Sequence, residues 1–134
     1  MRNGKKRKVL IVDGEANLRL LYGTNFKMSG YKVSLAATGA EAVVFAKTEK
    51  PDLVILDLKL PDNDGFDTMA ALLHEDQHLP VIINTGYSHF RADIRSWSAD
   101  AFMIKSSNVD ELMNKAAELL QREQNVGTAK LQHG

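Results

Sequence analysis

The sequence contains no cysteine, and this absence excludes disulfide bonds, thiolate metal sites and a cysteine nucleophile. It also has no apolar run that approaches the roughly 20 residues needed for a membrane-spanning helix. The 17 basic and 17 acidic residues balance, so the chain has no net charge that would attract nucleic acid or an acidic substrate. With 134 residues, of which 44% are hydrophobic, the chain predicts one globular domain, and the missing cysteines fit a cytoplasmic one.

Both ends of the chain are polar. The basic start from Lys5 to Lys8 precedes the apolar run V-L-I-V, which is too short for an export signal and ends in Asp13. We interpret these charges as a solvated lead-in to a strand, with nucleic-acid contact as the weaker alternative. We therefore expect a lead-in at residues 1–7, the domain at residues 8–122 and a frayed polar tail at residues 123–134.

Hydrophobic patterning predicts five strands. Four are continuously apolar, which is typical of strands buried on both faces, whereas the second alternates apolar and polar residues like a strand at a sheet edge. The predicted strands are residues 9–12, 31–35, 53–56, 81–83 and 101–104. Because they alternate with helical segments, we predict an α/β fold with a parallel sheet, and the edge-like second strand favours the order 2-1-3-4-5.

Helical periodicity occupies the intervals between these strands. Thr38 and Glu41 form a T-x-x-E capping box, and Asp64 is expected to cap the following helix. The last helix is expected to begin after Ser107 or Asn108. The helices are predicted near residues 18–26, 39–50, 66–73 and 109–120, with a short marginal helix at 87–98, where serines and histidines weaken the helical pattern.

Four of the predicted strands end on polar residues of complementary chemistry, namely Asp13, Asp57, Thr85 and Lys105. The carboxyl ends of parallel strands meet at one edge of a sheet, so these side chains are expected to lie together. Two carboxylates suit Mg²⁺, while a lysine and a hydroxyl can hold an anion that the metal also contacts. Taken singly, each residue could be an ordinary polar residue that faces solvent at the edge of the sheet. Together they indicate a phosphoryl site in which Asp57 is the nucleophile and forms an aspartyl phosphate.

Four stretches then carry a family resemblance: V-L-I-V-D-G-E, P-D-L-V-I-L-D-L-K-L-P-D-N-D-G, P-V-I-I-N-T-G and A-D-A-F-M-I-K. In this order and spacing they resemble the receiver domains of two-component response regulators, of the single-domain, chemotaxis-regulator-like kind, from about residue 8 to residue 120. The resemblance implies a flavodoxin-like (βα)5 fold. It also implies a phosphorelay signalling protein rather than an enzyme, with a sensor histidine kinase or a phosphotransfer protein as its phosphodonor.

By the same resemblance, each strand-end residue has an implied role. Asp57 would accept the phosphoryl group. Asp57 and Asp13, with the backbone carbonyl of Lys59, would surround Mg²⁺. Thr85 and Lys105 would bind the phosphoryl oxygens.

The resemblance further implies how the signal leaves the site. Phe102 matches the position of the family's switch aromatic, which turns inward as Thr85 moves toward the phosphate, and Gly86 leaves the approach open. The face formed by residues 87–98, the strand at 101–104 and the last helix would then bind a downstream protein. We expect a monomer or weak dimer that contacts neither nucleic acid nor a membrane directly.

Two positions depart from the family pattern, and the first is Gly14. The family usually has a second acid there, which commonly contacts the metal, and Glu15 is expected to point elsewhere. One carboxylate ligand is therefore missing, and we hypothesise that Mg²⁺ binding and phosphorylation are weakened or lost. This departure favours an alternative function, a pseudo-receiver that acts as a phosphorylation-independent interaction module.

The second departure follows Lys105, where the family typically has a proline, often in a cis bond. Ser106 stands there instead, and a cis bond before a residue other than proline costs about 3 kcal/mol. Either the bond is cis and strained, or it is trans and Lys105 is aimed elsewhere. The pair S-S also resembles a receiver subgroup in which it serves the start of the last helix, and we favour this capping role.

Other assignments remain open or are set aside. Tyr87, Phe90 and Trp97 are equally consistent with core packing and with a partner surface. A phosphohydrolase resembling the haloacid dehalogenases would need an acid two residues after Asp57, and Lys59 occupies that position. A nucleotide-binding domain would need a glycine-rich turn after the first strand, which G-E-A does not provide.

Overall fold

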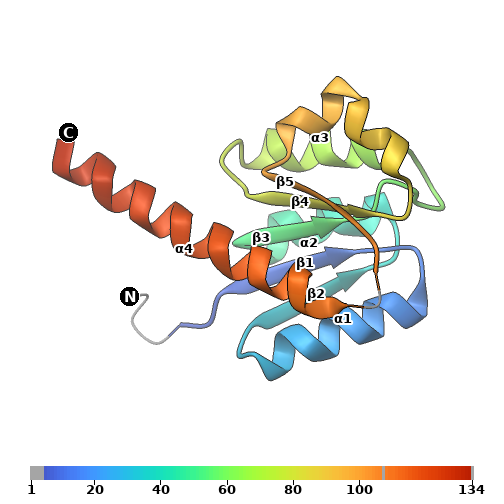
Figure 1. The fold of residues 1–134 in the computed structure, drawn as a ribbon, viewed down its shortest axis with the longest axis horizontal. Helices are drawn as coiled ribbons and strands as arrows, with labels where there is room; N and C mark the ends of the chain where they lie inside the picture. Colours follow the sequence, from blue (N-terminus) through green and yellow to red (C-terminus); the bar gives the residue numbers. More distant parts are fainter. Residues whose placement is uncertain (1–4, 107, 134) are drawn as a thin grey trace.

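A computed structural model describes residues 5–106 and 108–133, with side chains up to residue 121. Five parallel strands form a single sheet in the order β2-β1-β3-β4-β5 (Figure 1). They are β1 (Lys8–Val12), β2 (Lys32–Ala36), β3 (Leu53–Leu56), β4 (Val81–Thr85) and β5 (Ala101–Ile104). This flavodoxin-like order confirms the predicted one, and the partly polar strand β2 lies at an edge.

Helices cover both faces of the sheet (Figure 1). They are α1 (Ala16–Met28), α2 (Gly39–Glu49), α3 (Gly65–Glu75) and α4 (Val109–His133). Alternate strand residues face opposite sides, so there are two hydrophobic cores. One core packs strand residues such as Leu10 and Val54 against α2 and α3, and the other packs residues such as Ile11 and Ile55 against α1 and α4.

The predicted caps form. The Thr38 hydroxyl accepts a hydrogen bond from the Glu41 amide at 3.1 Å, and the Glu41 carboxylate accepts one from the Ala37 amide at 2.7 Å. Asp64 caps α3 by accepting from the Phe66 amide at 2.8 Å. These bonds satisfy amides that have no partner inside the helix, so they fix where α2 and α3 begin.

The segment 87–98 differs from the marginal α-helix expected there. It forms two 3₁₀ helices, η1 (Ser88–Ala92) and η2 (Ile94–Ser98), separated by extended backbone at Asp93. The Asp93 side chain accepts from the Arg95 amide at 2.9 Å, and the Ser96 hydroxyl donates to the Phe90 carbonyl at 2.6 Å. Such side-chain bonds to the backbone compete with α-helical hydrogen bonds, which explains the interruption.

Helix α4 also differs from its expected end near residue 121, because its backbone stays helical to His133. Figure 1 shows its last turns continuing past the edge of the sheet. Residues 122–133 contain no proline and several strong helix formers, which accounts for the continuation. The domain boundaries at residues 7 and 122 remain predictions. Within the described part of the chain, we find no helix with both the length and the apolar character to cross a bilayer.

Candidate functional site

The four polar strand ends meet at one edge of the sheet, as the parallel arrangement requires. Asp57 directly follows β3, and its amide donates to the Val12 carbonyl at 2.9 Å. Lys105 follows β5, and its amide donates to the carbonyl of Thr85, the last residue of β4, at 2.8 Å. Sheet hydrogen bonds therefore continue to these residues and hold their backbones in place.

The ammonium group of Lys105 lies between two buried carboxylates. Its Nζ is 2.9 Å from Oδ2 of Asp13 and 2.9 Å from Oδ2 of Asp57. The two aspartates are only 2% and 5% exposed, respectively. Their other oxygens accept from the amides of Glu15 at 2.9 Å and Lys59 at 3.2 Å. The cluster is thus fully hydrogen-bonded but carries one more negative than positive charge.

Burial and charge shift the pKa values of this cluster. Burial raises the pKa of Asp57, and the hydrogen bond and charge of Lys105 offset this only in part. Burial lowers the pKa of Lys105, but Asp57 and Asp13 together outweigh it, so the pKa lies above its usual value. Lys105 is therefore a permanent cation at neutral pH, and Asp57 is a carboxylate whose charge the fold only partly compensates.

This imbalance predicts that Asp57→Asn stabilises the fold at neutral pH. The folded protein binds the Asp57 proton more tightly than the unfolded chain, so its stability falls as pH rises from 3.8 through the raised pKa. The neutral amide of the variant removes that cost and leaves Lys105 paired with Asp13. We expect a gain of about 1 kcal/mol in the free energy of unfolding at pH 7, measured by urea denaturation. The gain should disappear near pH 3, and equal effects at both pH values would contradict this account.

Thr85 and Phe102 occupy different surroundings from the carboxylates. Thr85 is completely buried, and its hydroxyl accepts from the Tyr87 amide at 3.3 Å. Phe102 is half-buried and packs against the core on the α2 and α3 side. The Arg91 guanidinium carbon lies 4.9 Å from the centre of the Phe102 ring. The Phe102 ring therefore has a cation over one face.

One contact at the mouth of the site was not anticipated from the sequence. Lys59 Nζ donates to the Tyr87 hydroxyl at 3.1 Å and lies 5.1 Å from the centre of its ring. The two residues stand at matching positions, two residues past Asp57 and two past Thr85, and this spacing was the available signal. A cavity of about 350 Å³ adjoins them, lined by Leu58, Lys59, Leu60, Asn63, Asp64, Tyr87, His89 and Phe90.

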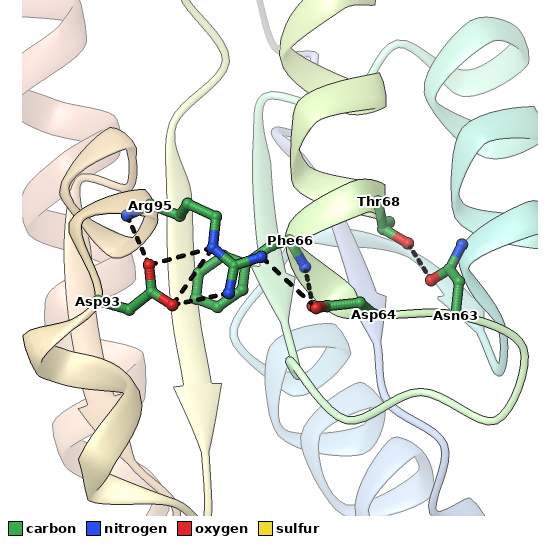
Figure 2. A network of polar contacts seen from close by, with 6 residues as sticks. All are labelled: Asn63, Asp64, Phe66, Thr68, Asp93 and Arg95. Carbon is green, nitrogen blue, oxygen red and sulfur yellow. Dashed lines mark hydrogen bonds and ion pairs between the residues drawn. The ribbon is translucent and has the colours of Figure 1, made fainter.

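The loop after β3 is anchored to both neighbouring helices. Asp62 accepts from the amides of Gly39 at 2.8 Å and Ala40 at 3.0 Å, and these bonds lower its pKa. Asn63 accepts from the Thr68 hydroxyl at 2.9 Å, as Figure 2 shows. The capping role predicted for this loop thus extends to α2, a helix distant in sequence. These contacts tie the loop that carries Lys59 to α2 and to α3.

The donor set suits Mg²⁺ but is one carboxylate short. Asp13 and Asp57 with the Lys59 carbonyl offer hard oxygen ligands of the kind that Mg²⁺ prefers. A Cβ atom built on Gly14 would lie 3.9 Å from that carbonyl oxygen, so a side chain at position 14 would border the same space. Within the described residues, no group of three histidine, cysteine or acidic side chains is placed to hold a metal.

The second departure from the family pattern is resolved in favour of the trans form. No cis peptide bond occurs in the described residues, and Lys105 nevertheless reaches both carboxylates. The expectation that a trans bond would aim Lys105 elsewhere is therefore wrong. The Ser106 hydroxyl accepts from the Asn108 amide at 2.9 Å, and Asn108 accepts from the Asp110 amide at 3.0 Å. Both serve the start of α4, whereas Ser107 lies outside the described residues.

The three aromatics left open by the sequence divide between the two interpretations. Phe90 packs against the core and meets Phe66 edge-on, with ring centres 5.8 Å apart. Tyr87 and Trp97 are 41% and 76% exposed, and Ile94 beside Trp97 is 69% exposed. Aromatic side chains are enriched in protein interfaces, so the exposure of Tyr87 and Trp97 favours the partner-surface interpretation.

The family model for the response regulator receiver domain matches residues 9–117. Given this match, the sheet order and the strand-end cluster, the chain belongs to the response regulator receiver family. Receiver domains are the signalling modules of two-component systems. The chain is 31% identical over 115 residues to sporulation initiation phosphotransferase F of Bacillus subtilis, covering 84% of this chain and 93% of that protein.

Larger relatives match over only part of their length. The chain is 34% identical over 122 residues to a probable transcriptional regulator, ycf27, of Cyanophora paradoxa, covering 90% of this chain. It spans about half of that protein, 51% of its length.

A similar solved structure is the response regulator TrrA of Thermotoga maritima in complex with Mg²⁺–BeF, at 35% identity. Its TM-score is 0.80, with coverage of 84% of this chain and 98% of that one. TrrA has also been solved in complex with the histidine kinase ThkA, at a TM-score of 0.79 and 36% identity over 85% of this chain and 98% of that chain.

Proposed function

We propose that this receiver accepts a phosphoryl group on Asp57 from a phosphohistidine. The observation that carries the proposal is the position of Asp57, a buried carboxylate at the end of β3 with Lys105 Nζ 2.9 Å from its Oδ2. A carboxylate oxygen attacks phosphorus, an O–P bond forms, and the P–N bond to the donor imidazole breaks. The product is an aspartyl phosphate.

The other residues of the site stabilise the transferred group. Lys105 is held charged by the carboxylates, so it can donate from Nζ to a phosphoryl oxygen, and the Thr85 hydroxyl can donate to another. Asp13, Asp57 and the Lys59 carbonyl would hold Mg²⁺, which when bound neutralises charge on the phosphoryl group. Gly86 supports an open approach, since nothing lies within 4 Å of a Cβ atom built there.

The proposed output is a change in a protein-binding face. Movement of Thr85 toward the phosphate would let Phe102 bury further and would reshape the surface of η2, β5 and α4. The exposure of Ile94 and Trp97 supports this face as the partner surface. The complex of TrrA with a histidine kinase supports a kinase as the phosphodonor.

Phosphorylation is tested by incubation with acetyl phosphate and Mg²⁺, followed by intact mass measurement. We expect the wild-type chain to gain one phosphate and Asp57→Asn to gain none, because the substitution removes the nucleophilic oxygen. Asp62→Asn is the matched control, since its carboxylate lies in the same loop but caps α2. A gain that persists in Asp57→Asn would place the phosphate elsewhere.

A second candidate is favoured by Gly14 and by the double contact of Lys105. The lysine already partly neutralises both carboxylates, and the acid that would strengthen Mg²⁺ binding is missing. In this alternative the chain is a pseudo-receiver that binds its partner without phosphorylation. No mass gain with acetyl phosphate or with a kinase, together with partner binding that Asp57→Asn leaves intact, would support it.

A further inference from the structure

Arg95 connects the segment 87–98 to the start of α3 (Figure 2). Its Nε and Nη2 donate to the Asp93 carboxylate at 3.1 and 2.7 Å. Its Nη1 lies 3.6 Å from Oδ2 of Asp64, and its guanidinium carbon is 4.0 Å from the centre of the Phe66 ring. The Arg95 guanidinium thus binds Asp93, in its own segment, through two nitrogens. It also forms an ion pair with Asp64 and stacks on Phe66 at the start of α3.

Asp93 sets the direction of this contact. Its carboxylate caps η2 through the Arg95 amide and also binds the Arg95 side chain, so the guanidinium is held in one orientation. Arginine loses less freedom when its planar group is already oriented. The contact with Asp64 and Phe66 is therefore made by a preorganised group rather than by a freely moving surface side chain.

The two ends of the Arg95 contact lie at functionally different places. Asp64 ends the loop that follows Asp57, and its other oxygen caps α3. Arg95 lies between Ile94 and Trp97, the exposed apolar residues of η2. Apart from Arg95, the ring of Phe90 also meets Phe66. Arg95 therefore joins the loop beside the phosphoacceptor to the exposed face through Asp64 and Phe66 at the start of α3, in addition to the contact of Lys59 with Tyr87.

We propose that Arg95 is a latch that sets the position of the exposed face according to the state of the loop after Asp57. When the loop keeps Asp64 and Phe66 in place, the latch holds η2 against α3. When the loop moves, Arg95 loses its contacts with Asp64 and Phe66. The helix η2, which carries Ile94 and Trp97, is then released from α3. The use of that face in signalling rests on the proposed function, whereas the latch itself requires no phosphate.

The first test is hydrogen–deuterium exchange of the full chain without a phosphodonor. Arg95→Gln should speed amide exchange across residues 87–98 about 5- to 30-fold, because it removes both the ion pair and the ring contact. Arg91→Gln is the matched control, since it removes the same charge from the same segment but contacts Phe102 on β5. Equal effects of the two substitutions would overturn the latch.

The second test changes only the loop side. Asp64→Asn keeps an oxygen that can cap α3 but removes the charge facing Arg95. It should speed exchange in residues 87–98, and the double variant with Arg95→Gln should be no faster than Arg95→Gln alone. Additive effects, or an unchanged segment 87–98 in Asp64→Asn, would show that the loop does not act on the face through Arg95.

The third test joins the latch to phosphorylation. Trp97 is the single tryptophan of the chain, so its emission reports on η2 alone. Acetyl phosphate with Mg²⁺ should change this emission in the wild type but not in Arg95→Gln, with equal phosphate gain by mass. A phosphorylated Arg95→Gln that responds like the wild type would overturn the coupling. A wild type that gains no phosphate would instead count against the proposed function, and the two exchange tests would still decide the latch.

Discussion

Gly14→Asp is expected to tighten Mg²⁺ binding by about 10- to 100-fold. The substitution adds a carboxylate next to the Lys59 carbonyl, since a Cβ atom at position 14 would lie 3.9 Å from that oxygen. It also adds a third carboxylate around the Lys105 ammonium, which increases the excess of negative charge and so favours a divalent cation. The measurement is a calorimetric titration with MgCl₂ on the unphosphorylated chain.

The backbone at Gly14 accepts a side chain. Its φ is not among the positive values of the described residues, so an L residue brings no conformational strain there. The built Cβ atom is 3.2 Å from Cδ of Pro61, which requires the proline ring to shift by a few tenths of an ångström. Gly14→Asn makes the same demand without the charge and is the control. Equal Mg²⁺ binding by the aspartate and asparagine variants would contradict the hypothesis that the missing acid weakens the site.

Gly65→Ala is expected to lower the free energy of unfolding by about 3 kcal/mol. A Cβ atom at Gly65 would collide with Cα of Leu58 and would lie 2.7 and 2.8 Å from the carbonyl oxygens of Leu58 and Asp57. All three are backbone atoms, so no side chain can rotate away. The Gly65 amide also donates to the Leu58 carbonyl at 2.8 Å, which holds the two segments at this separation.

Gly86→Ala is the control for this prediction, because no atom lies within 4 Å of its built Cβ. Urea denaturation should give a large loss of stability for Gly65→Ala and little change for Gly86→Ala. The displaced loop should also weaken phosphoryl transfer to Asp57, since the residues that must move are Asp57 and Leu58. A Gly65→Ala protein as stable as the wild type would show that the loop has more room than its contacts indicate.

Patterns along the chain were sufficient to predict the sheet and the strand-end cluster. Continuous apolar runs are characteristic of parallel strands buried on both faces, and the mixed pattern at β2 identifies one edge strand. The apolar run of β5 is the exception, because β5 lies at the other edge of the sheet and is only partly buried. Once the strands are parallel, Asp13, Asp57, Thr85 and Lys105 must emerge at one edge, because each stands at or directly after a strand end. The caps at Thr38 and Asp64 were predictable for a similar reason, since they depend on residues within a few positions of each other.

Contacts between residues distant in sequence could not be predicted in this way. The local sequence pattern does not indicate that Asp62 caps α2 rather than its own turn. It also does not indicate that Lys59 contacts Tyr87 beside the site. The secondary structure of segment 87–98 was hard to predict, because side-chain hydrogen bonds from Asp93 and Ser96 to the backbone compete with α-helical hydrogen bonds. The α-helical and 3₁₀ forms then differ only slightly in free energy.

Local sequence thus determines which residue stands at each strand end and helix cap. Tertiary packing determines where its side chain points and what it contacts. The sequence placed a lysine after β5 but left its direction open, and the fold directs it to both carboxylates through a trans bond. The sequence likewise contains Arg95 and Phe66, but the stacking of one on the other exists because β4 and β3 are neighbours in the sheet. Directions and partners of this kind depend on many weak interactions across the whole domain, whereas strand ends and caps depend on a few adjacent residues.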